Sequence, residues 1–166
     1  MQELKIVNAK AASFRDVNLN RIFDPNGQHK QSYEFSNSSV TQPYVSGEGK
    51  LSVAFYTLQP GKSSYPFHHH TGIEEVFYII SGKGCLETKE GVVEVSEGDV
   101  IVMPANENGA HMLTNNSDLP LTYLDVDTVS APEVIVYPHT GNVRVMAGKI
   151  QKSFRIDSEV NYLDGE

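Results

Sequence analysis

The middle of the chain is a series of short apolar or alternating runs separated by turn residues. From residue 40 to 146, glycine, proline and asparagine interrupt these runs at fairly regular intervals. This spacing is typical of an all-β sandwich or barrel. No long segment in this range has the 3.6-residue period of an amphipathic helix. The runs that we expect to form strands are 53–58, 75–81, 85–88, 92–95, 100–103, 121–126 and 134–137, with a hairpin turn at 89–91.

The two ends of the chain have a different pattern. Residues 1–39 are polar and rich in Asn, Gln and Ser, with one short apolar stretch at 4–7. They predict an N-terminal arm with one or two edge strands. Residues 147–166 contain several apolar anchors, and such residues at a terminus usually dock on the rest of the domain. We therefore expect a single domain with an arm at 1–39, a small β-barrel or jelly roll at 40–146, and a C-terminal tail at 147–166 packed on the barrel. The anchors in the tail are Phe154, Ile156, Val160, Tyr162 and Leu163.

Length and charge exclude several functional classes. The 166 residues fit one domain, and no apolar run approaches the roughly 18 residues that cross a bilayer, so no membrane association is expected. The 13 Lys and Arg against 21 Asp and Glu give a formal charge of −8. This charge repels phosphate backbones, so nucleic acid is not an expected partner. The lone Cys85 and the absence of a secretory pattern at residues 1–7 both favour the cytoplasm.

A cluster of histidines is the strongest chemical signal in the sequence. Side chains alternate along an extended strand, so a His-x-His pair places the imidazoles of His68 and His70 on one face. A carboxylate soon afterwards and the later imidazole of His111 would complete a mixed nitrogen and oxygen ligand set. Such a set suits one divalent first-row ion, and iron, manganese, nickel, cobalt and zinc all remain open.

The spacing around these residues resembles the two signature motifs of the cupin superfamily. His68 and His70 are followed after four residues by Glu75, and Glu75 after six residues by Gly82. The second motif is matched by Gly98, Pro104, His111 and Asn115, with a Pro104–His111 loop two residues longer than is usual.

The resemblance implies a cupin-like β-barrel whose metal ligands are His68, His70, Glu75 and His111. The ends of the chain are also similar to those of one-domain bacterial cupins, with Tyr137-Pro138 after the barrel and residues 160–166 at the close. Some members of that group have a sugar-phosphate isomerase label by analogy.

One ligand position stays open between two neighbours. Strict strand parity would place Glu74, four residues after His70, on the face of the histidines. The break at Thr71-Gly72 resets parity. We therefore prefer Glu75 and keep Glu74 as the alternative. His69 faces away from the pair, and His29 and His139 are expected at the surface.

A metal in this ligand set would allow two kinds of enzyme. In a redox-neutral reaction such as aldose–ketose isomerisation, the metal would stabilise an enediolate while a nearby base moves a proton. Alternatively, ferrous iron would bind substrate and dioxygen together, as in a dioxygenase. The catalytic residues are not assigned at this stage. Candidate acids and bases are Tyr56, Tyr78, Tyr123, Glu107 and Asp125.

A different class of function is a binding module. The barrel could hold a small ligand without turnover, because function belongs to the site and not to the scaffold. In either case the expected partner is a small-molecule substrate or ligand. An arm and exposed edge strands also favour a homodimer, because sheet edges tend to be hidden by pairing.

Overall fold

A computed structural model describes residues 4–24 and 26–164, with the backbone alone at residues 45 and 46. The parts of the expected arm and tail at residues 1–3, 25 and 165–166 lie outside the described residues. Among the described residues, no helix is long and apolar enough to span a bilayer.

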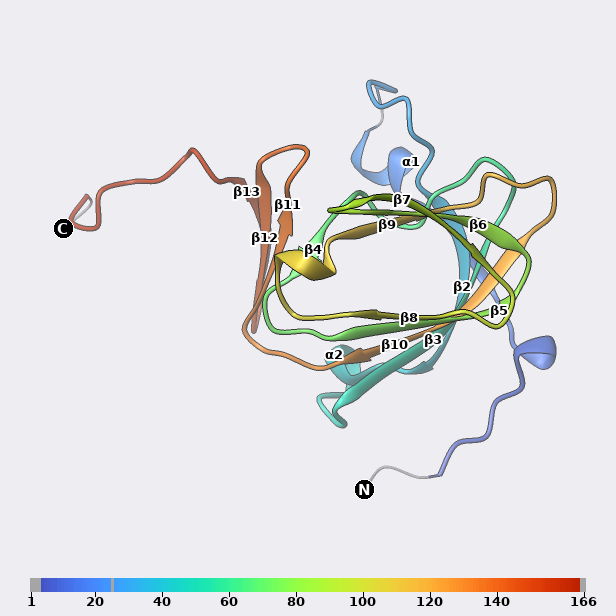
Figure 1. The fold of residues 1–166 in the computed structure, drawn as a ribbon. Coiled ribbons are helices and arrows are strands. Elements are labelled where there is room, and N and C mark those ends of the chain that lie inside the picture. The colour runs from blue at the N-terminus through green and yellow to red at the C-terminus, as the bar shows by residue number, and fades with distance from the viewer. Residues whose placement is uncertain (1–3, 25, 165–166) are drawn as a thin grey trace.

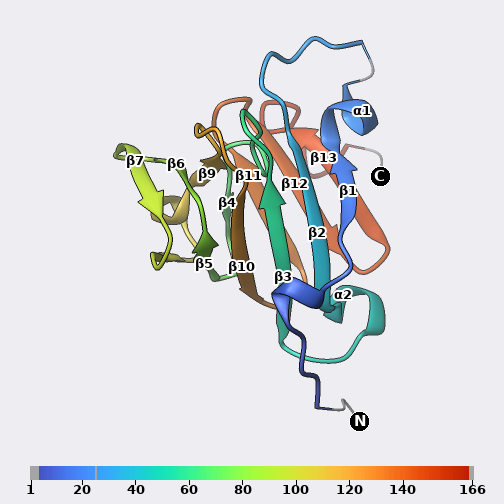
Figure 2. The same ribbon diagram turned by 90° about the vertical axis from the view of Figure 1, so that its right-hand side faces the viewer.

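The chain folds into three antiparallel sheets, drawn in Figures 1 and 2. The first has six strands in the order β1-β2-β3-β10-β5-β8, formed by Arg15–Asn18, Glu34–Thr41, Leu51–Leu58, Leu121–Thr128, Glu75–Ser81 and Val100–Met103. The second has the order β7-β6-β9, formed by Gly91–Ser96, Lys83–Thr88 and His111–Thr114. The third has the order β13-β12-β11-β4, formed by Ile150–Arg155, Asn142–Ala147, Glu133–Tyr137 and His69–His70.

Helical segments are few and short. They are η1 (Ala9–Ala11), α1 (Leu19–Phe23), α2 (Pro43–Ser46) and η2 (Glu107–Gly109). Figure 1 shows the β6, β7 and β9 sheet facing the β5, β8 and β10 part of the large sheet across an interior. The all-β jelly roll expected from the sequence is therefore confirmed. The described strands pair as three separate sheets, so the hydrogen bonding does not close into a continuous barrel.

Strands with strong apolar patterns lie where the sequence predicts them. β5 and β8 have the expected bounds, and β6 and β7 form the expected hairpin, with Gly91 at a φ of 126°. The one or two strands expected in the arm correspond to β1 and β2, of which only β1 is an edge strand, whereas β9 and the β12–β13 hairpin were missed. β2 consists largely of Ser and Asn, yet Phe35 and Asn37 are buried because it pairs with β1 and β3.

The expected boundaries of the arm and tail need correction. The boundary at 39/40 falls inside β2, and that at 146/147 falls inside β12, so strand pairing continues across both. Within the expected tail, Ile150–Arg155 form β13 and pair with β12, whereas the apolar anchors of the tail are exposed in the described chain. In Figure 1 the tail runs outward beyond β13. The exposed side chains are Phe154, Ile156, Val160, Tyr162 and Leu163.

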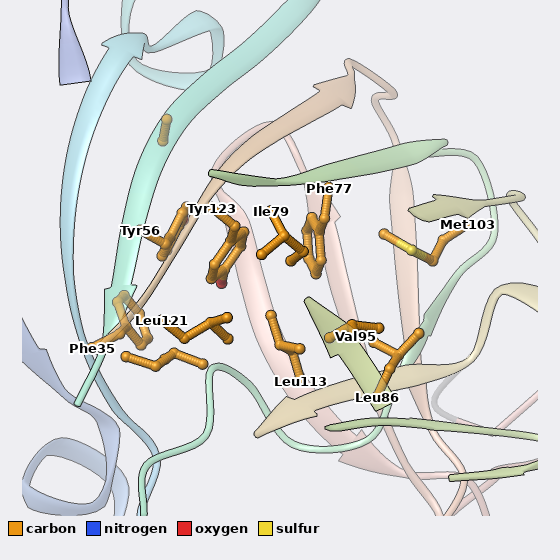
Figure 3. Close-up of a cluster of buried hydrophobic side chains, with 12 residues drawn as sticks. Phe35, Tyr56, Phe77, Ile79, Leu86, Val95, Met103, Leu113, Leu121 and Tyr123 are labelled. Carbon is orange, nitrogen blue, oxygen red and sulfur yellow. The ribbon is translucent and has the colours of Figure 1, made fainter. Parts of the chain in front are cut away.

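The core lies between the two facing sheets (Figure 3). The central strand β10 contributes Leu121 and Tyr123, which are almost fully buried. The same inner face of β10 continues with Asp125 and Asp127, because side chains two residues apart share a face. Asp127 lies opposite Glu75 of β5 in the strand register. The interior thus changes along one strand from apolar to acidic, and the candidate site lies at its polar end.

Candidate metal centre

Backbone pairing brings His68 and His111 together although they are far apart in sequence. The two residues form an antiparallel bridge in which each backbone N–H donates to the other's carbonyl, at 3.1 and 2.9 Å. Their rings lie on the same side, with centroids 4.8 Å apart. Both side chains are buried. This bridge places one imidazole from the first motif beside the imidazole from the second.

His70 and Glu75 reach the same point from other elements. His70 lies in β4, opposite Ile135 of β11, and its ring centroid is 5.1 Å from that of His68. Glu75 opens β5 and is 7% exposed. The ligand atoms of His68, His70 and Glu75 all lie within 4.8 Å of one another. Glu75 Oε2 lies 3.5 Å from His70 Nε2 and 3.5 Å from His111 Nε2.

Hydrogen bonds to backbone carbonyls fix two of the three imidazoles. Nδ1 of His68 lies 2.8 Å from the carbonyl oxygen of Pro66, and Nδ1 of His111 lies 2.9 Å from that of Gly109. A carbonyl only accepts, so each Nδ1 carries the proton and each Nε2 keeps its lone pair. This is the arrangement that orients histidines in metal sites. The free Nε2 atoms are therefore available as ligands.

The three imidazoles are held neutral by their surroundings. Burial lowers the pKa of His70 to about 4 and that of His111 to about 4, and the neighbouring imidazole of His111 also lowers the pKa of His70. Burial lowers the pKa of His68 well below its usual value. A neutral imidazole is the form that binds a metal ion. At neutral pH no proton competes with a cation at these nitrogens.

The carboxyl of Glu75 fits a cation for a different reason. Burial raises its pKa well above the usual value, and the nearby Asp127 adds to the shift. Its Oε2 is buried without a hydrogen-bond partner. A buried polar atom in this state costs free energy unless a partner compensates it. A divalent ion between this oxygen and the three nitrogens would supply that partner, so the residues present fit a metal.

The loop before His111 is compact despite its additional length. Residues Glu107–Gly109 form η2, with the side chain of Asn106 accepting from the backbone N–H of Asn108. A Cβ on Gly109 would collide with the carbonyl oxygen of Pro104, so the turn packs tightly against the end of β8. The two additional residues are absorbed in this turn, and His111 still enters the site.

The neighbouring glutamates differ sharply in position. Glu75 lies among the histidines, whereas Glu74 is exposed and its backbone N–H donates to Thr128 Oγ1. β5 begins at Glu75, after the break at Thr71-Gly72 that resets strand parity. Of the other histidines, His29 and His139 are both exposed as expected, and the ring of His139 stacks on Phe67.

The candidate acids and bases fall into two groups. Tyr78 and Glu107 are exposed and point away from the centre. Tyr56 and Tyr123 are buried in the aromatic core, where their rings stack at 5.2 Å. Asp125 is buried, and its carboxylate lies within 4.8 Å of that of Glu75. Only Asp125 among them places a carboxyl beside the centre.

Two further carboxylates at the site were missed by the sequence reasoning. Glu133 Oε1 accepts from the backbone N–H groups of Thr71 and Gly72 and lies 3.4 Å from His70 Nδ1. Nothing in the apolar run at 134–137 marks this residue in advance. The sequence did contain a signal for Asp127, because Asp125 and Asp127 lie on the same face of the strand as the apolar residues Leu121 and Tyr123. Acidic residues on a buried face are uncommon without a role.

Part of the sequence matches a known family model. Residues 54–127 match the model described as a cupin domain, a range that begins in β3, ends in β10 and includes all four candidate ligands. No curated protein matches the sequence.

Several solved structures share the fold. One is a sugar phosphate isomerase of the cupin superfamily from Silicibacter pomeroyi, which is 20% identical to this chain and has a TM-score of 0.75. The alignment covers 96% of this chain and 98% of that one. A predicted oxalate decarboxylase from Thermotoga maritima is 21% identical and has a TM-score of 0.60, and the alignment covers 76% of this chain and 100% of that one. The polyketide cyclase RemF from Streptomyces resistomycificus is 17% identical and has a TM-score of 0.57, and the alignment covers 77% of this chain and 81% of that one.

At these identities the likeness is one of fold, and the three names describe three different reactions. The family match, the jelly roll and the position of the two histidine motifs agree with one another. The match to the cupin domain model covers residues 54–127, which is less than half of the chain, and beyond that range the likeness is one of fold.

Proposed function

We propose that the protein binds one divalent metal ion through His68, His70, Glu75 and His111 and acts as a metalloenzyme on a small molecule. One observation carries the proposal. The unpartnered, buried Oε2 of Glu75 lies 3.5 Å from the Nε2 atoms of both His70 and His111. Carboxylate oxygen and neutral imidazole nitrogen together suit iron, manganese, nickel, cobalt or zinc.

The bound ion would supply a positive centre that polarises a carbonyl oxygen of the substrate and acidifies the adjacent C–H. An ion held by these four residues would still be able to accept oxygen atoms of a substrate. A small molecule with neighbouring hydroxyl and carbonyl oxygens is therefore the substrate class that we infer, and a sugar or sugar phosphate has this chemistry.

The surroundings of the site favour proton transfer as the reaction. Burial raises the pKa of Asp125 well above its usual value, and Asp127 and Glu75 add to the shift. A buried carboxyl whose pKa is raised is a better base than an ordinary carboxylate, so it can both take and return a proton. In an isomerisation the proton leaves one carbon and returns to its neighbour, so no oxidant is needed. The name of the Silicibacter pomeroyi protein supports this class.

Metal analysis tests the ligand set. The purified chain, loaded with Mn²⁺ or Zn²⁺ and desalted, should retain metal, and His70→Ala should reduce the affinity at least about tenfold. His29→Ala is the matched control, because His29 is exposed and lies in the loop between α1 and β2. Full metal retention by His70→Ala, with the control unchanged, would contradict the proposed centre.

An exchange experiment tests the reaction. In deuterated water, the metal-loaded chain should incorporate deuterium beside the carbonyl of an aldose, a ketose or their phosphates, followed by NMR. Asp125→Asn should slow this exchange by about two orders of magnitude, the range of general base catalysis. Oxygen uptake with catechols, thiols or dicarbonyls would instead indicate a ferrous dioxygenase. Metal binding with neither reaction would indicate a non-catalytic ligand-binding cupin.

A further inference from the structure

Three carboxylates meet on the inner face of the large sheet, on the side of Glu75 toward β10. Asp127 lies directly opposite Glu75 in the register of β10 and β5, and Asp125 is two residues away on the same face. One ligand oxygen from each of Glu75, Asp125 and Asp127 lies within 4.8 Å of the other two. Two neighbouring strands thus hold three acidic groups around one point.

Each of the three carboxyl groups has a buried oxygen without a partner, although Asp127 also forms side-chain hydrogen bonds with Asp125 and Ser52. Asp125 is 6% exposed and Glu75 is 7% exposed. The Oδ1 atoms of Asp125 and Asp127 and the Oε2 atom of Glu75 are buried without hydrogen-bond partners. Within the described part of the chain, no Lys or Arg forms an ion pair with any of the three. Buried carboxylates in such a group are normally paired or bound to a metal.

We propose that Glu75, Asp125 and Asp127 form a second cation site, selective for a divalent ion that prefers oxygen ligands, with Glu75 shared between this site and the histidine centre. Carboxylate oxygens are the ligands of Mn²⁺, Mg²⁺ and Ca²⁺. A divalent ion here would offset the mutual repulsion of the three carboxylates. It would also give the unpartnered oxygens a ligand to coordinate.

The carboxylate of Glu75 would coordinate an ion at each of the two sites. Its Oε2 faces the nitrogens of His70 and His111, and the carboxylate also approaches Asp125 and Asp127. A carboxylate has two oxygens and about four lone-pair positions, so it can serve two ions at once. The result is a pair of unlike sites, one rich in nitrogen and one made of oxygen. This proposal shares two residues with the proposed function: Glu75, a proposed ligand of the histidine centre, and Asp125, the proposed proton-transfer group.

The alternative is that protons, and not a cation, neutralise the cluster. The two cases differ in ion stoichiometry. Equilibrium dialysis of the metal-free full-length chain against Mn²⁺ at about pH 7.5 should give two ions per chain. Asp125→Asn and Asp127→Asn should each reduce this to one. Asp118→Asn, an exposed aspartate on the loop before β10, should leave two.

A magnetic measurement identifies where the second ion lies. Two Mn²⁺ ions bridged by Glu75 should give an exchange-coupled electron paramagnetic resonance spectrum. In Asp125→Asn this spectrum should collapse to that of isolated Mn²⁺. Circular dichroism of each variant checks that the fold is retained. If a variant does not fold, Asp125→Ser or Asp127→Ser replaces it in the same titration.

The outcomes separate this proposal from the histidine centre. One ion per chain that both Asn variants still bind, or an unchanged count and spectrum in both Asn variants, would overturn the carboxylate site. His70→Ala tests the other centre, because it should remove the nitrogen-bound ion and leave the ion held by oxygen. If His70→Ala kept both ions while the Asn variants lost one, the histidine centre alone would fail.

Discussion

Glu74 and Glu75 are adjacent and chemically identical, but they have opposite surroundings. Glu75 is buried among the imidazoles, and Glu74 is exposed. Glu75→Gln keeps the shape and removes the charge, so metal affinity should fall at least about tenfold. The fold should persist, because burial already favours the uncharged form of Glu75 in the metal-free protein.

Glu74→Gln is the control and should change metal affinity less than about twofold, since an exposed carboxylate outside the ligand set contributes little. Calorimetric titration with Zn²⁺ measures both variants. Equal loss of affinity in the two would contradict the ligand assignment, and so would loss in Glu74→Gln alone.

The pH dependence of stability should report the acidic cluster. Burial raises the pKa of Asp127 to about 6, whereas in the unfolded chain the group titrates near 3.8. Between these values the folded, metal-free protein holds a proton that the unfolded chain has lost. The contribution of Asp127 to the free energy of unfolding is therefore fully present below about pH 4 and is lost as the pH rises through 6.

Asp127→Asn stays neutral at every pH. It should raise the free energy of unfolding of the metal-free protein above pH 6 by up to about 3 kcal/mol and change it little at pH 4. His70 and His111 act in the opposite direction, because their pKa values are lowered, but they are present in both proteins. Urea unfolding at pH 4 and pH 8 measures the difference. An equal shift at both pH values would contradict it.

At the residue scale, motif spacing identified the four candidate ligands because each spacing is tied to a strand or a turn. The position of Glu133 could not be predicted in this way. It acts through the backbone of Thr71 and Gly72, more than sixty residues earlier, and only the pairing of β4 with β11 brings them together. Contacts of this kind depend on sheet order, which local pattern does not specify.

At the element scale, η2 delivers His111 to the site and depends on a glycine. Gly109 has an ordinary backbone conformation, but a Cβ there would collide with the carbonyl oxygen of Pro104. Gly109→Ala should therefore move the turn, destabilise the protein by about 1–3 kcal/mol and weaken metal binding.

Asn108→Ala lies in the same turn but is exposed, and it should leave metal binding almost unchanged. Thermal unfolding and Zn²⁺ titration of the two variants distinguish the effects. Metal binding by Gly109→Ala that equals that of Asn108→Ala would show that the turn does not control His111.

Elements with alternating apolar residues were predictable, and those with polar or very short sequences were not. β5 and β8 have the predicted bounds because their apolar residues favour a buried strand over other local structures. β4 is only two residues long; the His-x-His pattern predicts an extended segment there, but its partner β11 could not be predicted from local pattern. β2 similarly depends on the strands on either side of it.

At the scale of the whole molecule, a single chain leaves the apolar side chains of the tail in contact with water. The exposed side chains include Ile156 at 64%, Val160 at 78% and Leu163 at 68%. Apolar area kept in water costs roughly 25 cal/mol per Å² compared with burial. The outer strands β1, β8 and β13 also leave sheet edges unpaired within the described residues. A second copy of the chain could cover both features.

We therefore propose a homodimer in which the tail packs on the partner. Light scattering after gel filtration should give about twice the mass of the 18.3 kDa chain. Replacing Val160 and Leu163 together by Asp should convert the dimer to a monomer, because two charges would be buried at the contact. Leu119→Asp is the control, since Leu119 is equally exposed but lies on a loop before β10. A monomer in the unaltered protein, or a dimer that survives the double change, would show that the tail has another role.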